Sequence, residues 1–193
     1  MQDKELFKDR VMKKIIKKLF NKKSASQAEL EYLVREGLSL GKNVRIHSEY
    51  PFDSLFPWLI SVGNNVCISS NVKILAHDTS TEYVNDYTKI GIVEIHDNVY
   101  IGYGTIILCN TRIGENSIIG AGSVVTHDVP ANCVYSGVPA KYICTVDEFK
   151  QKHTDNLKDA IIVDGPVSRW KSKTIEEKKI IKERLKNNFG YMK

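Results

Sequence analysis

Residues 95–125, IHDNVYIGYGTIILCNTRIGENSIIGAGSVV, decide the fold of this 193-residue chain, because an aliphatic residue returns at every sixth position. The six members of this series are Ile95, Ile101, Ile107, Ile113, Ile119 and Val125. A second series, two positions before each next aliphatic residue, holds small or β-branched side chains: Val99, Thr105, Thr111, Ser117 and Ser123. Glycine directly follows several of the isoleucines, so the repeating unit is Ile-Gly-x-x-(small)-x.

A period of six keeps the aliphatic residues on one side of the chain, because side chains alternate with a period of two along a β-strand. Each hexad can supply one short strand and one turn, where the repeated Gly and Asn accept a positive φ. Three hexads close a triangular coil of about 18 residues, and coils stack as parallel strands about 4.8 Å apart. A generic β-sandwich does not require this regularity. The pattern therefore predicts a mainly β fold, a parallel β-helix.

The repeat begins before this stretch and is interrupted twice. Its unit is already present from Leu40 onward, and we place the β-helix at residues 38–144. Two irregular segments, 47–61 and 77–89, break the repeat. Loops that interrupt a rigid β-helix expose polar residues beside it, and binding and catalytic sites are commonly built in this way.

Both ends of the chain have apolar residues at helical spacing. The predicted helices cover 3–22, 26–36, 146–153 and 174–188, and capping boxes open the second and the last of them. The expected organisation is an N-terminal helical segment (1–37), the β-helix (38–144, with a loop at 77–89) and a C-terminal helical extension (145–193).

The composition is that of a soluble globular protein, with 42% hydrophobic and 26% charged residues. The chain shows no secretory signal and no apolar run long enough to span a bilayer, so a cytoplasmic location is expected. Its four cysteines have neither CxxC nor zinc-site spacing and are interpreted as small buried residues.

The net charge of +5 is concentrated near the two ends, at residues 4–23 and 171–193. Basic helices can bind nucleic acid or anionic lipid, but such charge is more often the solvated face of a helix. No nucleic-acid-binding motif accompanies it. We expect no nucleic-acid partner, and we leave membrane contact open.

Residues 90–143, IGIVEIHDNVYIGYGTIILCNTRIGENSIIGAGSVVTHDVPANCVYSGVPAKYI, resemble the hexapeptide-repeat acyltransferases. The nearest subgroup is the maltose, galactoside and exopolysaccharide O-acetyltransferases. The most specific shared pieces are residues 119–125 and 137–141, and the resemblance extends well over 62–143 and loosely over 38–61. It implies a left-handed β-helix, acetyl-CoA as co-substrate, and a homotrimer with sites between neighbouring subunits.

Acetyl transfer to a hydroxyl group needs a base that removes the proton, and a neutral imidazole suits this task. Of the five histidines, only His77 stands where the repeat passes into a loop, and it matches the family's catalytic histidine. His47, in the other irregular segment, is the reserve candidate. His96 is interpreted as a turn residue, and His153 lies in the C-terminal extension.

The resemblance also implies an oxyanion donor and parts of the acceptor site. The backbone N–H of Tyr103 falls on the family's oxyanion position, where a fixed donor stabilises developing charge. Tyr100 replaces a tryptophan of the sugar acetyltransferases, so it either lines the acceptor pocket or is a simple surface aromatic residue. Asp78 either binds a sugar hydroxyl, orients His77 or caps the turn of the loop, which we expect to help form the acceptor pocket.

A groove for coenzyme A is implied by small residues that allow a close backbone approach and by polar residues beyond them. The predicted coenzyme-binding residues are Gly102, Gly120, Ala121, Thr126, His127 and Lys141. His127 stands where the family has lysine, and Cys144 stands at another basic position. Both departures weaken the expected contacts with the phosphates.

These residues favour acetyl-CoA-dependent O-acetylation of a sugar hydroxyl in a polysaccharide, lipopolysaccharide or glycoside, with His77 acting directly as general base. N-acetylation of an amino sugar, free or nucleotide-linked, is the alternative on the same scaffold. Gamma-type carbonic anhydrases share the prism but need three histidines, two of them five residues apart. This chain lacks that spacing, so no metal is expected. A non-catalytic scaffold is the remaining alternative.

Overall fold

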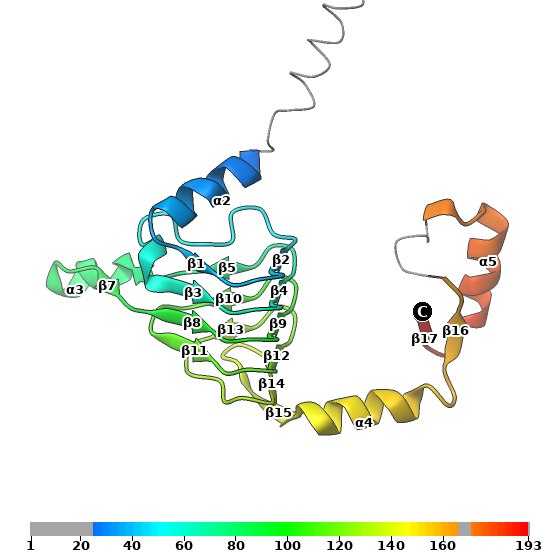
Figure 1. The fold of residues 1–193 in the computed structure, drawn as a ribbon. Helices are drawn as coiled ribbons and strands as arrows, with labels where there is room; N and C mark the ends of the chain where they lie inside the picture. The colour runs from blue at the N-terminus through cyan, green and yellow to red at the C-terminus, as the bar shows by residue number, and fades with distance from the viewer. Residues whose placement is uncertain (1–24, 166–170, 193) are drawn as a thin grey trace, which may run out of the picture. The chain divides into compact units, whose positions relative to one another are not determined.

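The computed structural model describes residues 25–165 and 171–192 and divides into two compact units. One unit ends at Ile143, and the other begins at Cys144. The first unit is a stack of flat coils that form a triangular prism (Figure 1). The helix predicted at 3–22, with most of the basic N-terminal segment, lies outside the described residues.

Three sheets form the faces of the prism, and their strands within the coils pair in parallel. Face A consists of β1 (Ser39–Leu40), β3 (Ile60–Val62), β8 (Val93–Ile95) and β11 (Thr111–Ile113). Face B consists of β2 (Arg45–Ile46), β4 (Cys67–Ile68), β9 (Tyr100–Ile101), β12 (Ile118–Ile119), β14 (Cys133–Ser136) and, at its edge, β15 (Lys141–Thr145). Face C consists of β5 (Lys73–Ile74), β10 (Ile106–Ile107) and β13 (Val124–Val125).

The strand register confirms the predicted coil of about 18 residues. Three pairs from the aliphatic series, each 18 residues apart, lie side by side: Ile95 with Ile113, Ile101 with Ile119, and Ile107 with Val125. All six members are buried, with at most 2% of their surface exposed. Full burial of one such side chain stabilises the fold by about 1.5–3 kcal/mol, so this inward row is the main source of stability.

Each corner of the prism is a set of turns that join the same two faces. Corner AB lies between β3 and β4 and at the equivalent turns, and corner BC lies between β9 and β10 and at the equivalent turns. Corner CA joins face C to face A, as between β10 and β11. The two irregular segments both fall at corner CA, in consecutive coils.

The first irregular segment is shorter than predicted, because Phe52 keeps a place in the repeat through a bridge with Ile74 of β5. The chain then makes one 3-10 turn, η1 (Pro57–Leu59), before it enters β3. The second segment is a projecting arm, in which β6 (His77–Asp78) pairs antiparallel with β7 (Lys89–Ile90). Between these strands lie η2 (Thr79–Thr81) and α3 (Glu82–Asn85), which extend away from the prism (Figure 1).

A ladder of asparagine side chains runs along corner AB. Its five members have φ between 56° and 60°, as the sequence predicts for these turns: Asn43, Asn65, Asn98, Asn116 and Asn132. Each amide Nδ2 donates to the Oδ1 of the next asparagine at 3.0–3.2 Å. Asparagine suits this corner because it accepts the left-handed conformation and also bonds to the coil beside it.

Helix α2 (Ala25–Arg35) packs its Leu33 side chain into the core of the first unit, where that residue is 2% exposed. The second unit contains α4 (Val146–Asn156), β16 (Ile161–Val163), α5 (Ile175–Arg184) and β17 (Gly190–Met192). The capping box predicted at Thr174 is confirmed, but α5 ends at Arg184, earlier than predicted, and the parallel pair of β16 and β17 was not predicted. Among the described residues, no helix combines the length and apolar character needed to cross a bilayer.

Replacement of Asn98 tests the ladder, because this residue has a partner on each side. Asn98→Ala removes both amide bonds and forces alanine into a left-handed conformation, so we expect a loss of about 1–3 kcal/mol in the free energy of unfolding. Asn98→Gly removes the bonds but tolerates the backbone and should lose clearly less. Urea denaturation measures both variants, and equal stability of the wild type and Asn98→Ala would contradict a role for the ladder.

Candidate active site

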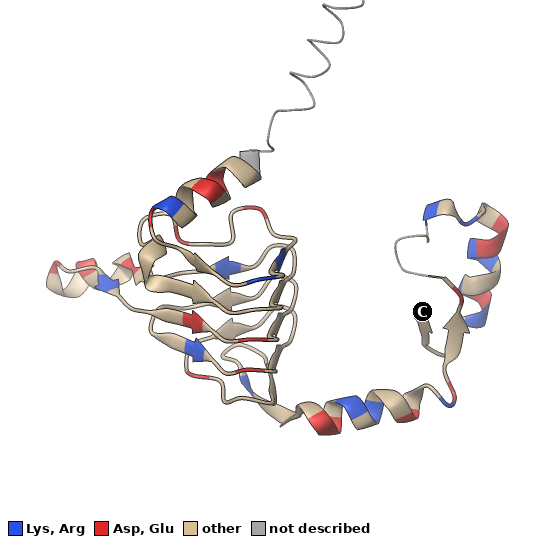
Figure 2. Cartoon of the chain, viewed as in Figure 1, with Lys and Arg blue, Asp and Glu red and all other residues tan. Residues whose placement is uncertain are grey.

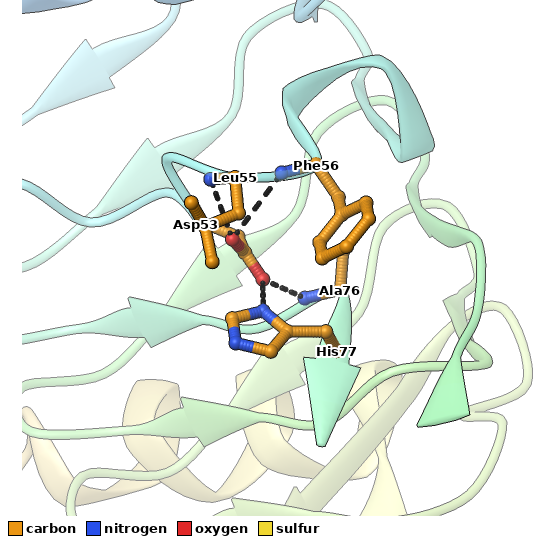
Figure 3. A network of polar contacts seen from close by, with 5 residues as sticks. All are labelled: Asp53, Leu55, Phe56, Ala76 and His77. Carbon is orange, nitrogen blue, oxygen red and sulfur yellow. Dashed lines mark hydrogen bonds and ion pairs between the residues drawn. The ribbon is translucent and has the colours of Figure 1, made fainter. Parts of the chain in front are cut away.

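The two irregular segments meet at corner CA, where Asp53 of the first contacts His77 of the second. The Asp53 Oδ2 atom accepts a hydrogen bond from Nδ1 of His77, and the two groups form an ion pair when the imidazole is protonated (Figure 3). A carboxylate can only accept, so Nδ1 carries the proton. The neutral ring then has its lone pair on Nε2, which points away from Asp53 and makes no hydrogen bond within the described chain (Figure 3).

Three backbone N–H groups hold the Asp53 carboxylate in place. Leu55 and Phe56 donate to Oδ1 at 3.0 and 3.4 Å, and Ala76 donates to Oδ2 at 2.9 Å (Figure 3). Burial raises the pKa of the Asp53 carboxyl, but the hydrogen bonds from His77, Leu55 and Ala76 together outweigh burial and leave the pKa below its ordinary value. Asp53 is therefore a buried anion with a fixed orientation, suited to hold one tautomer of His77.

Aromatic side chains pack beside His77. The Phe56 ring centroid lies 5.3 Å from that of His77 and 5.4 Å from that of Trp58. Phe56 thus limits the rotation of the imidazole on one side, while Asp53 holds its Nδ1 edge (Figure 3). His77 is half-buried, so its ring remains accessible to a bound molecule.

The structure decides among the local roles considered for Asp78. Its Oδ1 accepts a hydrogen bond from the backbone N–H of Ser80 at 2.9 Å and caps η2. The partner of His77 is Asp53, so Asp78 caps the turn and does not orient the histidine through Nδ1. Contact of Asp78 with an acceptor sugar stays a prediction.

Tyr103 and Tyr100 lie on another part of the prism, at corner BC and on face B. The Tyr103 backbone N–H makes no hydrogen bond to any described residue, as an oxyanion donor requires. Its hydroxyl accepts from Asn71 Nδ2 at 2.5 Å, and the Tyr100 hydroxyl accepts from Ser69 Oγ at 3.2 Å. Both tyrosine rings are partly exposed, and both hydroxyls have a partner in the neighbouring coil.

The predicted coenzyme-binding residues divide between two corners and one sheet edge. Gly102, Gly120 and Ala121 lie at or next to the turns of corner BC, where a Cβ on Gly102 would come within 2.5 Å of the Ala121 nitrogen. Thr126 and His127 lie at corner CA, and a hydrogen bond of 2.6 Å joins Thr126 Oγ1 to His127 Nδ1. Lys141 is exposed at the start of β15.

One chain therefore does not assemble the whole predicted site. His77 is at corner CA, whereas Tyr103 is at corner BC, on the other side of face C. The reserve histidine, His47, is exposed directly after β2 and has no carboxylate partner among the described residues. His96 is an exposed turn residue after β8, as predicted.

Sequence reasoning missed Asp53, Phe56 and Trp58. A signal was available, because Asp53 lies inside an irregular segment that interrupts the repeat one coil before His77. That both segments leave the prism at the same corner follows only from the register. Among the described side chains, no group of three or more His, Cys, Asp or Glu residues could hold a metal ion.

Comparison with known proteins relates the chain to transferases. Residues 92–127 match the family described as bacterial transferase hexapeptide (six repeats). A galactoside O-acetyltransferase of Lactococcus lactis is 38% identical over 128 residues, which cover 61% of this chain and 60% of that protein. A 2,3,4,5-tetrahydropyridine-2,6-dicarboxylate N-acetyltransferase of Clostridium perfringens is 48% identical over 65 residues, 34% of this chain and 28% of that protein. The chain spans about three fifths of the length of the curated relatives that it matches over 100 residues or more.

Solved structures agree with the fold. A maltose O-acetyltransferase from Clostridium difficile 630 is 30% identical, with a TM-score of 0.51 over 75% of this chain and 89% of that chain. A galactoside acetyltransferase solved in complex with coenzyme A is 24% identical, with a TM-score of 0.50 over 76% of this chain and 84% of that chain. These likenesses support the left-handed form of the parallel β-helix.

The lowered pKa of Asp53 predicts how stability depends on pH. A carboxyl group whose pKa falls on folding stabilises the native state above its ordinary pKa, and this contribution is lost as the pH falls through the folded pKa. We expect Asp53→Asn to lower the free energy of unfolding by about 1–3 kcal/mol at pH 7. The difference in the free energy of unfolding between Asp53→Asn and the wild type should become smaller below about pH 4.

Urea denaturation at a series of pH values measures this difference. Asp86→Asn is the matched control, because Asp86 is exposed in the arm and its left-handed conformation suits asparagine. A difference for Asp53→Asn that stays constant from pH 7 to pH 3 would show that the ionised carboxylate adds no stability.

Proposed function

We propose that this chain, which belongs to the bacterial hexapeptide-repeat transferases, transfers an acetyl group from acetyl-CoA to a hydroxyl group of a sugar. The observation that carries the proposal is the Asp53–His77 pair, which leaves Nε2 with a lone pair and no partner in the described chain. The names of the relatives support an acetyl donor and a maltose- or galactoside-like acceptor. The acceptor class is a polysaccharide, lipopolysaccharide or glycoside.

In the proposed reaction, His77 Nε2 takes the proton of the acceptor hydroxyl as its oxygen attacks the thioester carbonyl. A C–O bond forms and the C–S bond breaks, and the proton passes from the imidazole to the departing sulfur. Asp53 stabilises the imidazolium that exists between these two transfers and keeps the ring in one orientation. The Tyr103 backbone N–H donates to the oxygen that becomes negative in the transition state.

The residues of corner BC fit a pantetheine arm. The backbone N–H groups of Tyr103 and Ala121 have no partner within the described residues. A Cβ added at Gly104 or Gly122 would meet nothing within 4 Å, so the surface beside these N–H groups is open. Acetyl-CoA supplies the activated acetyl group, and these turns would bind its pantetheine through backbone donors. Thr126, His127 and Lys141 are the proposed contacts further along the coenzyme.

We further propose that the working site forms between copies of the chain in a homotrimer. His77 and Tyr103 lie at different corners of one prism, so a site that uses both takes them from two copies. The outward positions support this arrangement. Face A has polar residues there, Ser39, Ser61, Glu94 and Arg112. Faces B and C have Arg45 and Lys73 in their earlier coils (Figure 2) and the apolar side chains of Tyr100, Ile106, Ile118 and Val124 in their later coils. The later coils of faces B and C therefore suit contact with a neighbour.

The match to an N-acetyltransferase supports N-acetylation as a second candidate function. A neutral amino group loses a proton when its nitrogen attacks the thioester, so it needs the same base and the same oxyanion donor as a hydroxyl group. The described residues therefore suit both acceptors. Offering sugars with matched hydroxyl and amino groups, while release of free coenzyme A is followed, separates the two. Faster turnover of the amino sugars would overturn the O-acetyl assignment.

Substitution of His77 tests the proposed base. His77→Ala should lower kcat by about 10²–10⁴-fold with acetyl-CoA and a sugar acceptor, because it removes the group that is proposed to take the proton. Asp53→Asn should lower kcat by a factor that is still large but smaller than that for His77→Ala, since it disturbs the orientation and charge of His77. His96→Ala is the control, because this exposed histidine lies at corner AB. Activity of His77→Ala within tenfold of the wild type, with the fold intact, would refute the assignment.

Mixing two inactive variants tests the site between copies. Tyr103→Pro removes the proposed oxyanion N–H, and His77→Ala removes the base. The two variants are co-expressed with different tags, and purification through both tags selects mixed oligomers. In a site between copies, some of these oligomers combine an intact His77 with an intact Tyr103. We expect activity to return to a substantial fraction of the wild type, whereas each variant alone stays inactive. Inactive mixed oligomers of normal size would place both residues of a site in one copy.

A further inference from the structure

The segment that holds Asp53 also presents a tryptophan beside the proposed base. Trp58 lies in η1 and contacts Phe56 edge to face at 5.4 Å, and Phe56 in turn contacts His77 at 5.3 Å. Trp58 itself makes no ring contact with His77 in the described structure. The indole is therefore one ring further from His77 than Phe56 is.

Trp58 is 58% exposed, and Leu55 in the same segment is 62% exposed. Tryptophan buries a large apolar surface when it can, so an exposed indole next to a reactive group points to a bound molecule. These two side chains, three residues apart in one segment, are largely uncovered by the described chain, and together they are called the patch below.

The exposure of Trp58 does not come from a loose backbone. Pro57 is buried at the first position of η1, and the cap residue Ile60 donates its N–H to the Pro57 carbonyl. Gly37, after α2, has φ +104°, and a Cβ there would lie 2.8 Å from the Cβ of Trp58. The close approach of Gly37 and the buried Pro57 fix the backbone and Cβ of Trp58, from which the exposed indole extends.

We propose that Trp58 binds a sugar unit that flanks the acetylated one, and that the acceptor is accordingly an oligosaccharide or polysaccharide. This inference rests on the proposed function, because it takes His77 Nε2 as the position of the reacting hydroxyl. A pyranose ring is about as wide as the Phe56 ring, so a sugar unit at Nε2 does not itself cover Trp58. A longer acceptor extends beyond the reacting hydroxyl, and Trp58 is an exposed aromatic side chain that this segment offers to a further unit. The C–H groups on the face of a pyranose ring pack against an indole, which excludes water from both apolar surfaces.

A second copy of the chain is the competing occupant of this patch. The observations favour a glycan, because the patch lies on the segment that holds Asp53, and ring contacts connect Trp58 through Phe56 to His77. A residue used only for assembly would not change the preference for acceptor length. The preference for acceptor length therefore distinguishes the two occupants.

The experiment compares acetylation of mono-, di- and oligosaccharides by the wild type, Trp58→Ala and Trp58→Phe. We use a set of glucose, maltose and maltoheptaose, a matched galactose set, and a glycan array that extends the range of sugars. For the wild type, kcat/KM should rise with chain length. Trp58→Ala should raise KM for the longer acceptors by roughly three- to tenfold, with kcat and all values for monosaccharides nearly unchanged. Trp58→Phe should recover much of the loss.

Tyr32→Ala is the matched control, because Tyr32 is an aromatic residue 47% exposed on α2 and outside the ring contacts that lead to His77. Equal KM values for Trp58→Ala and the wild type with every active acceptor would overturn the inference while the proposed function stands. Loss of the oligomer in Trp58→Ala, seen by analytical ultracentrifugation, would assign the patch to a neighbouring copy and also overturn it. Absence of acetylation with every sugar of the array would instead overturn the proposed function, and the inference with it.

Fluorescence gives a readout that does not depend on turnover. The chain has two tryptophans, so Trp170→Phe leaves Trp58 as the single indole. Addition of the oligosaccharide with the highest kcat/KM should shift or quench its emission, and the monosaccharide should not. An unchanged emission at saturating oligosaccharide would contradict contact with Trp58.

Discussion

Each coil of the prism must place its aliphatic residues directly over those of the coil before it, and the rest of the structure depends on this constraint. The inward row is almost free of solvent and packs without a break from Val62 to Val125. A slip of one residue would turn that row outward, because the side-chain period of a strand is two. The register is thus held by burial, and extra residues can leave the prism only at its corners.

This constraint explains how a hydrogen-bonded pair of aspartate and histidine can arise in a simple repeat. The chain leaves the prism at corner CA in two consecutive coils, and each exit begins from a strand position that the core holds in place. Phe52 occupies face C beside Ile74, so the residues that follow each of them, Asp53 and Ala76-His77, meet at the same corner. The Asp53 carboxylate then receives two backbone N–H groups from its own segment and one from the coil of His77. A rigid stack thereby orients an imidazole although both residues lie in irregular segments.

The corners differ in chemistry although their turns share one geometry. Corner AB is closed by the hydrogen-bonded asparagine ladder. Corner BC has glycine turns with open space beside them and N–H groups that have no partner in the part of the chain that the structure describes. Corner CA contains the charged pair, the aromatic residues Phe56 and Trp58, and the projecting arm. The proposed chemistry needs the second and third corners together, which is why we propose a site between copies of the chain. Trp58 is connected to His77 through Phe56 at this same corner, which is why we propose that it binds a further sugar of a longer acceptor.

The sequence by itself determined the prism, its coil length and its inward row, because a six-residue period allows one arrangement of short strands once the side-chain alternation of a strand is imposed. It also pointed to His77 as the candidate base, through its place at the edge of a break and through the resemblance to the hexapeptide acyltransferases, and this role stays a prediction. Only the tertiary structure decided that Asp53, rather than Asp78, pairs with His77, and that Tyr103 lies at a different corner. The physical reason is that the irregular segments carry no period. Which of their residues meet depends on the coil at which each segment leaves the prism, and the hydrogen-bonded register of the stacked strands sets that position.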